Sequence, residues 1–192
     1  SEAMTVRANI LASARHVSQL ADAETRPLPV QPISADSHVT EPPDCYVARI
    51  DPKYRDRAPR VASNQRGGQV YVIKGANDGK PYMVSVGGMA SAGVDPRAIE
   101  LAGWTFDDIP RGGFDGTARV AEQERDGIGG EIIYPTVGMV LCNHPDAQFK
   151  HACFQAYNRW LQEFQSAAPD RLFGLGQSAV LSVEQTVRDL RD

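Results

Sequence analysis

The sequence predicts an α/β fold in which a parallel sheet is covered by helices. Three apolar segments with strand character, at residues 31–38, 131–136 and 171–180, alternate with segments of helical periodicity. This alternation is typical of βαβ units, whose strands pair in parallel. The 192 residues, of which 42% are hydrophobic and 23% charged, have the length and composition of one ordinary globular domain.

Residues 1–30 are expected to form an arm that precedes the main domain. Ser1-Glu2-Ala3 before Met4 is typical of an expression scar. Residues 5–24 place apolar side chains at steps of three and four, which indicates one amphipathic helix: Ile10, Leu11, Ala14, Val17, Leu20 and Ala21. We therefore expect a helical arm at 1–30 and the α/β domain at 31–192.

The first strand carries the candidate chemistry. Alternate side chains of a strand share a face, so Asp36 and His38 are expected side by side at its end, before Pro42 and Pro43. A carboxylate and an imidazole in this arrangement can share one divalent metal ion. The competing interpretation is an aspartate that only caps a turn.

Glu41, three residues beyond His38, also has two interpretations. It can be a partner outside the ligand set that orients the metal-binding imidazole of His38. Equally, it can be a surface carboxylate in a loop.

An insertion is expected after the first strand, over about residues 62–113. Residues 69–74 and 81–86 are rich in β-branched and aromatic side chains and flank a turn-forming segment, which predicts a β-hairpin. A short helix is expected before the insertion, at 43–49. The Gly-rich residues 87–113 lack the spacing of a phosphate-binding loop and are expected to be irregular.

The helix after the insertion has clear end signals. Asp115 is a typical N-cap for a helix at 116–126, and Gly127 is a typical stop. The strand at 131–136 follows. Thr136 at its end is expected either to line a pocket or to stabilise the turn.

The last elements are a long helix, a strand and a short helix. The long helix is expected to begin at Pro145 or Asp146 and to end at Ala168, before Pro169. Ser182 and Gln185 form a capping box for the last helix. Its apolar side chains are expected to face inward: Val183, Val187 and Leu190.

Composition excludes several classes of partner. The net charge of −4, with scattered Lys and Arg, gives no basis for binding nucleic acid or an anionic membrane surface. No apolar run is long enough to span a bilayer. Three cysteines at unrelated spacings fit neither a disulfide framework nor a cysteine zinc site, so we expect a reducing, cytoplasmic location.

No nucleophile or catalytic acid or base can be assigned from the sequence. A Gly-x-Ser-x-Gly elbow is absent, and no cysteine has a base beside it. His144 and His151 have no paired donor at metal spacing and are expected to be capping or surface residues.

Four ordered motifs resemble the amidohydrolase-related TIM-barrel enzymes, in the branch of the aminocarboxymuconate semialdehyde decarboxylase-like and resorcylate decarboxylase-like proteins. The motifs are Ile33-Ser34-Ala35-Asp36-Ser37-His38-Val39-x-Glu41-Pro42, the segment from Phe114-Asp115 to Tyr134-Pro135-Thr136, Ala156-Tyr157-Asn158-x-Trp160-Leu161, and Pro169-Asp170-Arg171-Leu172-Phe173-Gly174-Leu175. They cover most of residues 31–192. The resemblance implies the N-terminal part of a (β/α)₈ barrel with an inserted β-hairpin, the barrel being incomplete in these residues.

The resemblance also implies a metal-dependent hydrolase or a decarboxylase, a carboxy-lyase of a small carboxylate. The metal would be zinc, or alternatively manganese, with Asp36 and His38 as ligands from the first strand. The family's other ligands, a His after a mid-barrel strand and an Asp after the last strand, have no counterpart in these residues. We therefore expect this segment alone to be inactive.

The alternative from a different class is a non-catalytic fragment or truncated paralogue that acts as an interaction module. Three strands without the rest of a barrel leave a sheet edge and an apolar face open. We therefore expect self-association or a homo-oligomer, with a small-molecule substrate as the other partner if the protein is an enzyme.

Overall fold

The computed structural model describes residues 30–91, 95–97, 99 and 101–191. The chain divides into two units, residues 1–31 and 32–192, and every element described below belongs to the second. The arm expected at 1–30, including its scar and helix, lies outside the described residues.

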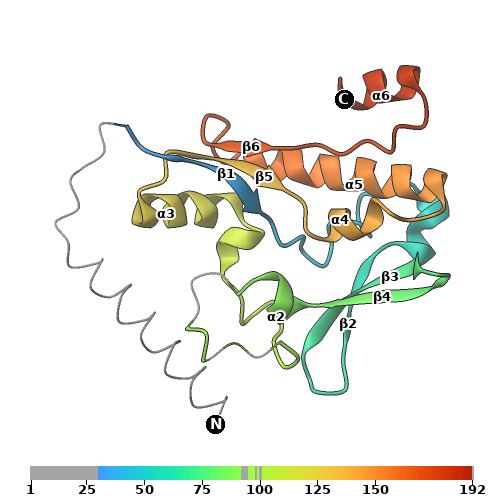
Figure 1. Cartoon of the computed structure of the whole chain (residues 1–192), viewed down its shortest axis with the longest axis horizontal. Helices are drawn as coiled ribbons and strands as arrows, with labels where there is room; N and C mark the ends of the chain where they lie inside the picture. The colour runs from blue at the N-terminus through green and yellow to red at the C-terminus, as the bar shows by residue number, and fades with distance from the viewer. Residues whose placement is uncertain (1–29, 92–94, 98, 100, 192) are drawn as a thin grey trace, which may run out of the picture. The chain divides into compact units, whose positions relative to one another are not determined.

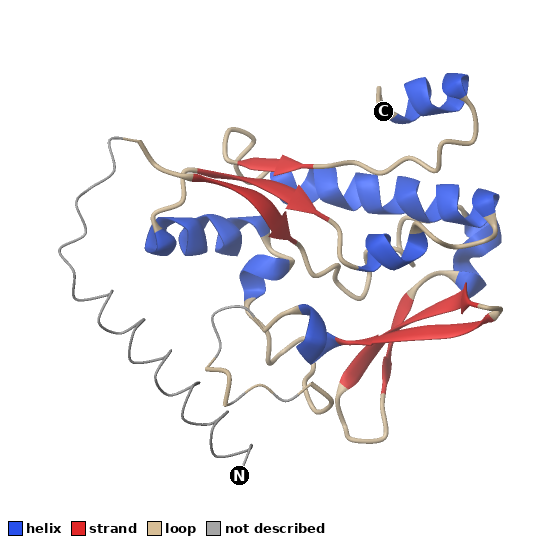
Figure 2. Cartoon of the chain, in the orientation of Figure 1, coloured by secondary structure: helices blue, strands red, loops and turns tan. Residues whose placement is uncertain are grey.

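A parallel sheet of three strands positions the candidate site (Figures 1 and 2). Its strands are β1 (Ile33–His38), β5 (Gly130–Tyr134) and β6 (Leu172–Gly174), in the order β1-β5-β6. Both pairings are parallel, which confirms the predicted βαβ topology. The complete eight-stranded barrel stays a prediction, because the described residues form only these three parallel strands.

Two helices cover one face of this sheet. Helix α3 (Gly116–Asp126) begins where Asp115 accepts the amides of Thr117 and Ala118, and it ends at Gly127, whose φ of 68° suits glycine. Helix α5 (Ala147–Gln165) is capped by Asp146 and buries a long apolar stripe: Phe149, Ala152, Cys153, Phe154, Ala156, Tyr157, Trp160, Leu161 and Phe164. Both helices were predicted from these cap and periodicity signals.

The sheet contributes alternate residues to the core beneath α5. Ile133 and Leu172 are buried in the same apolar cluster as the α5 stripe. Glu131, two residues before Ile133, is hydrogen-bonded to α3. The two helices therefore lie against one face of the sheet.

The insertion forms a second, antiparallel sheet (Figure 2). The predicted hairpin is confirmed as β3 (Gln69–Asn77) and β4 (Lys80–Ser85), joined at Asp78 and Gly79. These two residues have φ of 46° and 80°, the positive values of a tight two-residue hairpin turn. A third strand, β2 (Arg60–Ser63), which was not predicted, pairs with β3.

Several short elements differ from the predictions. Residues 43–49 form successive turns instead of a helix, and a 3₁₀ helix, η1 (Pro52–Arg57), follows them. The helices α2 (Val86–Met89), η2 (Arg111–Gly113) and α4 (Val137–Leu141) were not predicted. All three are too short to show a helical period in the sequence.

The C-terminal helix α6 (Val183–Asp189) begins at Ser182, whose side chain accepts the amide of Gln185 as predicted. The expected inward orientation of its apolar residues is wrong, because Val183 is 75% exposed and Leu190 78% exposed. Helical periodicity shows that a helix has an apolar side but does not show whether that side finds a partner.

Candidate metal centre

Asp36 and His38 converge at the carboxyl end of β1. Strand β1 has a bulge here. Ser34 pairs with Glu131 and Ser37 with Ile133, so two residues of β1, at 35 and 36, lie opposite the single β5 residue at 132. The bulge puts Ser34 and Ser37 on the helix-covered face, where their hydroxyls are 2.7 Å apart. On the other face, His38 Nε2 lies 3.5 Å from Asp36 Oδ1. The predicted proximity is confirmed; metal binding stays a prediction.

The His38 ring is held by the backbone of the neighbouring strand. Its Nδ1 is 2.9 Å from the carbonyl oxygen of Pro135, just past the end of β5. Because a carbonyl only accepts, Nδ1 carries the hydrogen in this contact. In the neutral ring, Nε2 then has a free lone pair, and this is the nitrogen that lies beside Asp36.

The spacing of these two atoms fits a shared metal ion. Zinc binds imidazole nitrogen and carboxylate oxygen at about 2.0–2.2 Å, so two donors on a tetrahedral ion lie about 3.3 Å apart. The observed separation is 3.5 Å. The Asp36 side chain is 85% exposed and the His38 side chain 37% exposed, so both can be reached from solvent.

Glu41 is fully buried and does not hold His38 directly. Its Oε1 accepts the amides of Thr136 and Gly138, and its Oε2 accepts that of Val137, at 3.0–3.2 Å. Burial raises the pKa of Glu41 above its ordinary value, although these amides favour the carboxylate. The interpretation as a surface carboxylate is therefore wrong, because Glu41 is buried. A role in orienting the His38 imidazole stays a prediction.

Thr136 stabilises the turn in which it lies. Its hydroxyl donates to the carbonyl of Val39 at 2.6 Å and so ties the end of β5 to the end of β1. Of the two roles expected for Thr136, the structure therefore shows the one in the turn.

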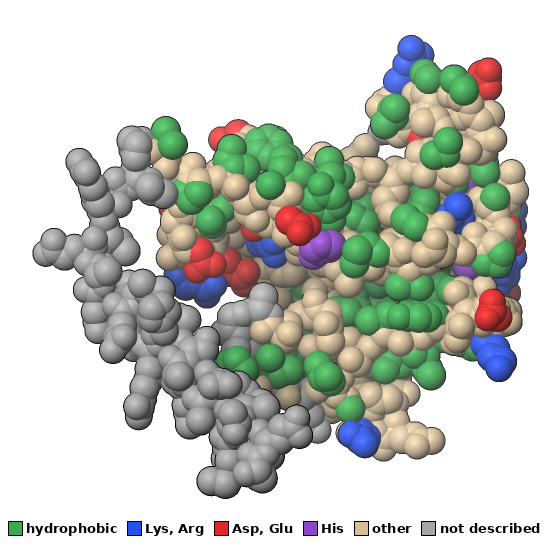
Figure 3. Space-filling view, viewed as in Figure 1, with side chains coloured by type: hydrophobic (Ala, Val, Ile, Leu, Met, Phe, Trp, Pro, Cys, Tyr) green, Lys and Arg blue, Asp and Glu red, His purple; other side chains and the backbone are tan. Residues whose placement is uncertain are grey.

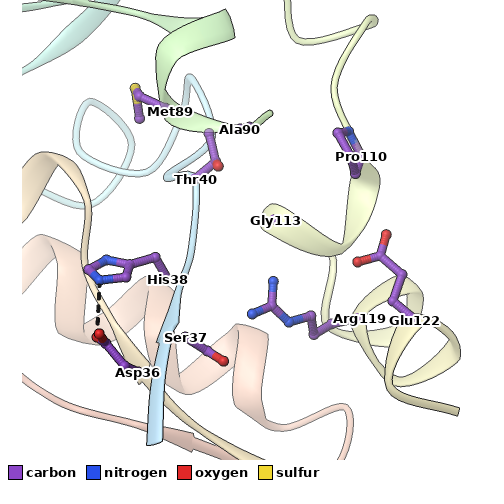
Figure 4. Close-up of a pocket in the computed structure, with 10 residues that line it drawn as sticks. All are labelled: Asp36, Ser37, His38, Thr40, Met89, Ala90, Pro110, Gly113, Arg119 and Glu122. Atoms are coloured by element: carbon purple, nitrogen blue, oxygen red, sulfur yellow. Dashed lines mark ion pairs between the residues drawn. The ribbon is translucent and has the colours of Figure 1, made fainter. Parts of the chain in front are cut away.

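A cavity of about 320 Å³ opens beside the Asp36–His38 pair (Figure 4). The end of β1 contributes Asp36, Ser37 and His38 to the lining, and the insertion contributes the apolar side chains of Met89, Ala90 and Pro110. The complete lining is Asp36, Ser37, His38, Thr40, Met89, Ala90, Pro110, Gly113, Arg119 and Glu122. Gly113 is tied to the strand end, since its carbonyl accepts the amide of Thr40 at 2.7 Å.

The cationic side chain in the cavity wall is already paired. Arg119 binds both carboxylate oxygens of Glu131, at 2.6 and 3.1 Å, and Gln123 and Ser37 donate to the same carboxylate. Burial acts to raise the pKa of Glu131, but these partners outweigh it and the pKa is lowered. Sequence reasoning missed this network; the signal was a charged residue inside an apolar strand.

The other histidines and the cysteines do not extend the site. His144 is buried instead of lying at the surface; its Nδ1 accepts the Asp146 amide, and its Nε2 lies 2.9 Å from the Lys74 carbonyl. His151 lies 3.6 Å from Asp189. Cys45, Cys142 and Cys153 are free, and burial raises the pKa of Cys45 well above its usual range. Among the described residues, no group of three or more His, Cys, Asp or Glu side chains is placed to hold a metal ion.

Comparison with known proteins supports the fold. No family model matches the chain, and no curated protein matches it. The crystal structure of an amidohydrolase from Mycobacterium avium subsp. paratuberculosis K-10 is similar, with a TM-score of 0.58 and 17% sequence identity. The match covers 86% of this chain and 46% of that one, so the chain spans less than half of its length.

The chain therefore has the fold of the N-terminal portion of an amidohydrolase, as the sequence motifs indicated. At this level of identity the similarity establishes the fold and not the activity. Within the described part of the chain, no helix has both the length and the apolar character needed to cross a membrane.

Proposed function

We propose that the chain supplies the first-strand ligands of a metal-dependent enzyme of the amidohydrolase type. Asp36 and His38 would hold the ion, with zinc as the first candidate and manganese as the second. The reaction would be hydrolysis, or non-oxidative decarboxylation, of a small carboxylate substrate.

One observation carries the proposal. Two donors from one strand end, Asp36 Oδ1 and His38 Nε2, lie 3.5 Å apart beside a cavity, and in the neutral ring the contact of Nδ1 with the Pro135 carbonyl makes Nε2 the nitrogen with the free lone pair. Such a hydrogen bond from the second ring nitrogen is how protein sites set the tautomer of a metal-binding histidine.

The chain's own residues then divide the work. Asp36 and His38 would bind the metal ion, the Pro135 carbonyl orients the imidazole, and the apolar lining of Met89, Ala90 and Pro110 favours a substrate with an apolar part. A bound divalent ion would polarise a substrate carbonyl or carboxylate and lower the pKa of bound water. Two protein donors leave the remaining coordination positions to water, to substrate or to donors outside the described residues.

The test is zinc binding to the purified protein, measured by isothermal titration calorimetry and by metal analysis after dialysis. We expect one zinc per chain in the wild type, and loss of that zinc in Asp36→Ala and in His38→Ala. His144→Ala is the matched control, because His144 is a histidine with backbone partners on both nitrogens. Equal zinc content in wild type and both ligand variants would contradict the proposal.

The interaction module is the second candidate function. It is favoured by the lack of a third metal donor near Asp36 and His38 among the described residues. A folded protein that takes up neither zinc nor manganese, and that forms a defined complex or oligomer, would support it over the enzyme.

A further inference from the structure

We infer that Glu41 is a positioning residue for His38, acting through the turn at 135–138. By holding the amides of this turn, the Glu41 carboxylate fixes the Pro135 carbonyl, and that carbonyl fixes the tautomer and direction of the imidazole. The effect of Glu41 on metal affinity rests on the proposed function. The effect of Glu41 on the tautomer and direction of the His38 ring does not.

The first step is the set of hydrogen bonds between the Glu41 carboxylate and the turn. Three successive amides, those of Thr136, Val137 and Gly138, all point at the two oxygens of Glu41. They are the orphan amides at the start of α4, which a short helix must satisfy from outside itself. The hydroxyl of Tyr46 reaches the same carboxylate at 3.4 Å. A fully buried carboxylate that accepts this many hydrogen bonds holds the backbone of the turn in one position.

The second step connects the turn to the imidazole. Pro135 directly precedes the three anchored amides, and Tyr134 before it is tied to the amide of Val39 at 3.1 Å. The Thr136 hydroxyl holds the Val39 carbonyl on the other side. The residues on both sides of Pro135 are therefore held by hydrogen bonds to Val39, and the Pro135 carbonyl oxygen lies 2.9 Å from His38 Nδ1.

The third step is the need for a carboxylate at this position. A carboxylate can accept all three amides because it offers only acceptors. A glutamine of the same shape would turn an NH₂ group toward at least one of the amides. Two donors would then face each other in a buried place, and the turn would have to shift. Glu41→Gln thus changes the turn while it keeps the side-chain volume.

The experiment compares wild type with Glu41→Gln. Long-range ¹⁵N–¹H NMR of the metal-free protein reports which nitrogen of His38 carries the hydrogen. We expect Nδ1–H in the wild type and a mixture, or the other tautomer, in Glu41→Gln. Zinc titration should show a dissociation constant raised about 10–100-fold, the usual effect of removing a group that orients a ligand.

The matched control is Glu131→Gln, which also removes a buried carboxylate, but one that lies on β5 and faces the helix-covered side of the sheet. It should lower stability and leave the His38 tautomer as in wild type. An unchanged tautomer in folded Glu41→Gln overturns the inference, as does an equal change in both variants. If Glu41→Gln does not fold, Thr136→Val loosens the same turn without removing a charge, and an unchanged tautomer there overturns it.

The two proposals fail in different ways. If the wild-type protein binds no zinc, the proposed function is refuted. The tautomer measurement still tests the role of Glu41 in that case. Conversely, if the wild type binds zinc but Glu41→Gln does not change the His38 tautomer, the proposed metal site stands and the positioning role of Glu41 is refuted.

Discussion

The two faces of the parallel sheet differ in how completely their side chains are partnered. On the covered face, Ile133 and Leu172 are buried against α5, and Glu131 is enclosed by Arg119, Gln123 and Ser37. On the open face, Tyr134 and Phe173 remain 37% and 40% exposed, and Asp36 and His38 have chiefly each other and one backbone carbonyl. Figure 3 shows hydrophobic side chains gathered over the strands, with a histidine beside an acidic side chain.

This difference separates stability from function within one sheet. The covered face buries apolar area and encloses its charges, which stabilises the fold. The open face keeps donor atoms accessible at the strand ends, where α/β folds commonly build their sites. Changes on the first face should therefore alter the free energy of unfolding, and changes on the second should alter binding.

The largest effect is expected from the buried ion pair. Arg119→Ala leaves Glu131 buried without its cation, which should cost about 3–5 kcal/mol in the free energy of unfolding, measured by urea denaturation. Arg125→Ala on the same helix is the control, because the Arg125–Asp126 pair is exposed and should contribute less than about 1 kcal/mol. Equal costs for the two variants would show that enclosure of the Arg119–Glu131 pair on the covered face adds no stability.

The same pair predicts a pH dependence. The pKa of Glu131 is lowered in the folded protein from its ordinary value of 4.5. Its stabilising contribution is therefore complete above that ordinary value and is lost as the pH falls through the lower, folded-state pKa. The stability difference between wild type and Glu131→Gln should be constant near neutral pH and should shrink in acid. A difference independent of pH would contradict this assignment.

Neighbouring residues of β6 give the next effect. Leu172 is 1% exposed on the covered face and Phe173 is 40% exposed on the open face. Leu172→Ala should cost about 2–5 kcal/mol, because it leaves a cavity in the core. Phe173→Ala should cost clearly less, despite removing the larger side chain. Thermal unfolding of the two variants checks this, and the reverse order would show that the faces are misassigned.

Zinc should stabilise the protein through the open face alone. At a free zinc concentration about 100-fold above the dissociation constant, the gain is about 2.7 kcal/mol. We expect this gain in the melting curve of wild type and its absence in His38→Ala. Without zinc, Asp36→Ala should change stability by less than about 0.5 kcal/mol, since its side chain is 85% exposed. A zinc-induced shift that survives in both variants would place the ion elsewhere.

The smallest effect concerns self-association of the open face. Replacing Ile33 and Phe173 by serine should weaken self-association at least tenfold, about 1.4 kcal/mol, in sedimentation velocity at micromolar concentration. Val183→Ser is the control, because Val183 is 75% exposed and lies on α6, which is separate from the parallel sheet (Figure 1). A wild-type protein that stays monomeric would contradict the expectation.

Local signals in the sequence predicted the regular elements and half of the site. Asp115 and Gly127 mark the ends of α3, and the alternation through Asp36 and His38 placed these two side chains together. Such signals work because caps and strand faces depend on residues within a few positions of one another. The short helix α4 escaped prediction because its start is satisfied by Glu41, far away in the chain.

Tertiary structure alone decided how the site is held. The contact of His38 with Pro135 joins residues 97 positions apart, and those of Glu41 with the following turn join residues 95–97 apart. Ser37 and Glu131 meet across 94 positions. The sequence by itself determined which donors stand on β1 and on which face. The nitrogen that carries the proton, and the carboxylate that anchors the turn, follow from the parallel pairing of β1 with β5, because only that pairing brings the two strand ends together.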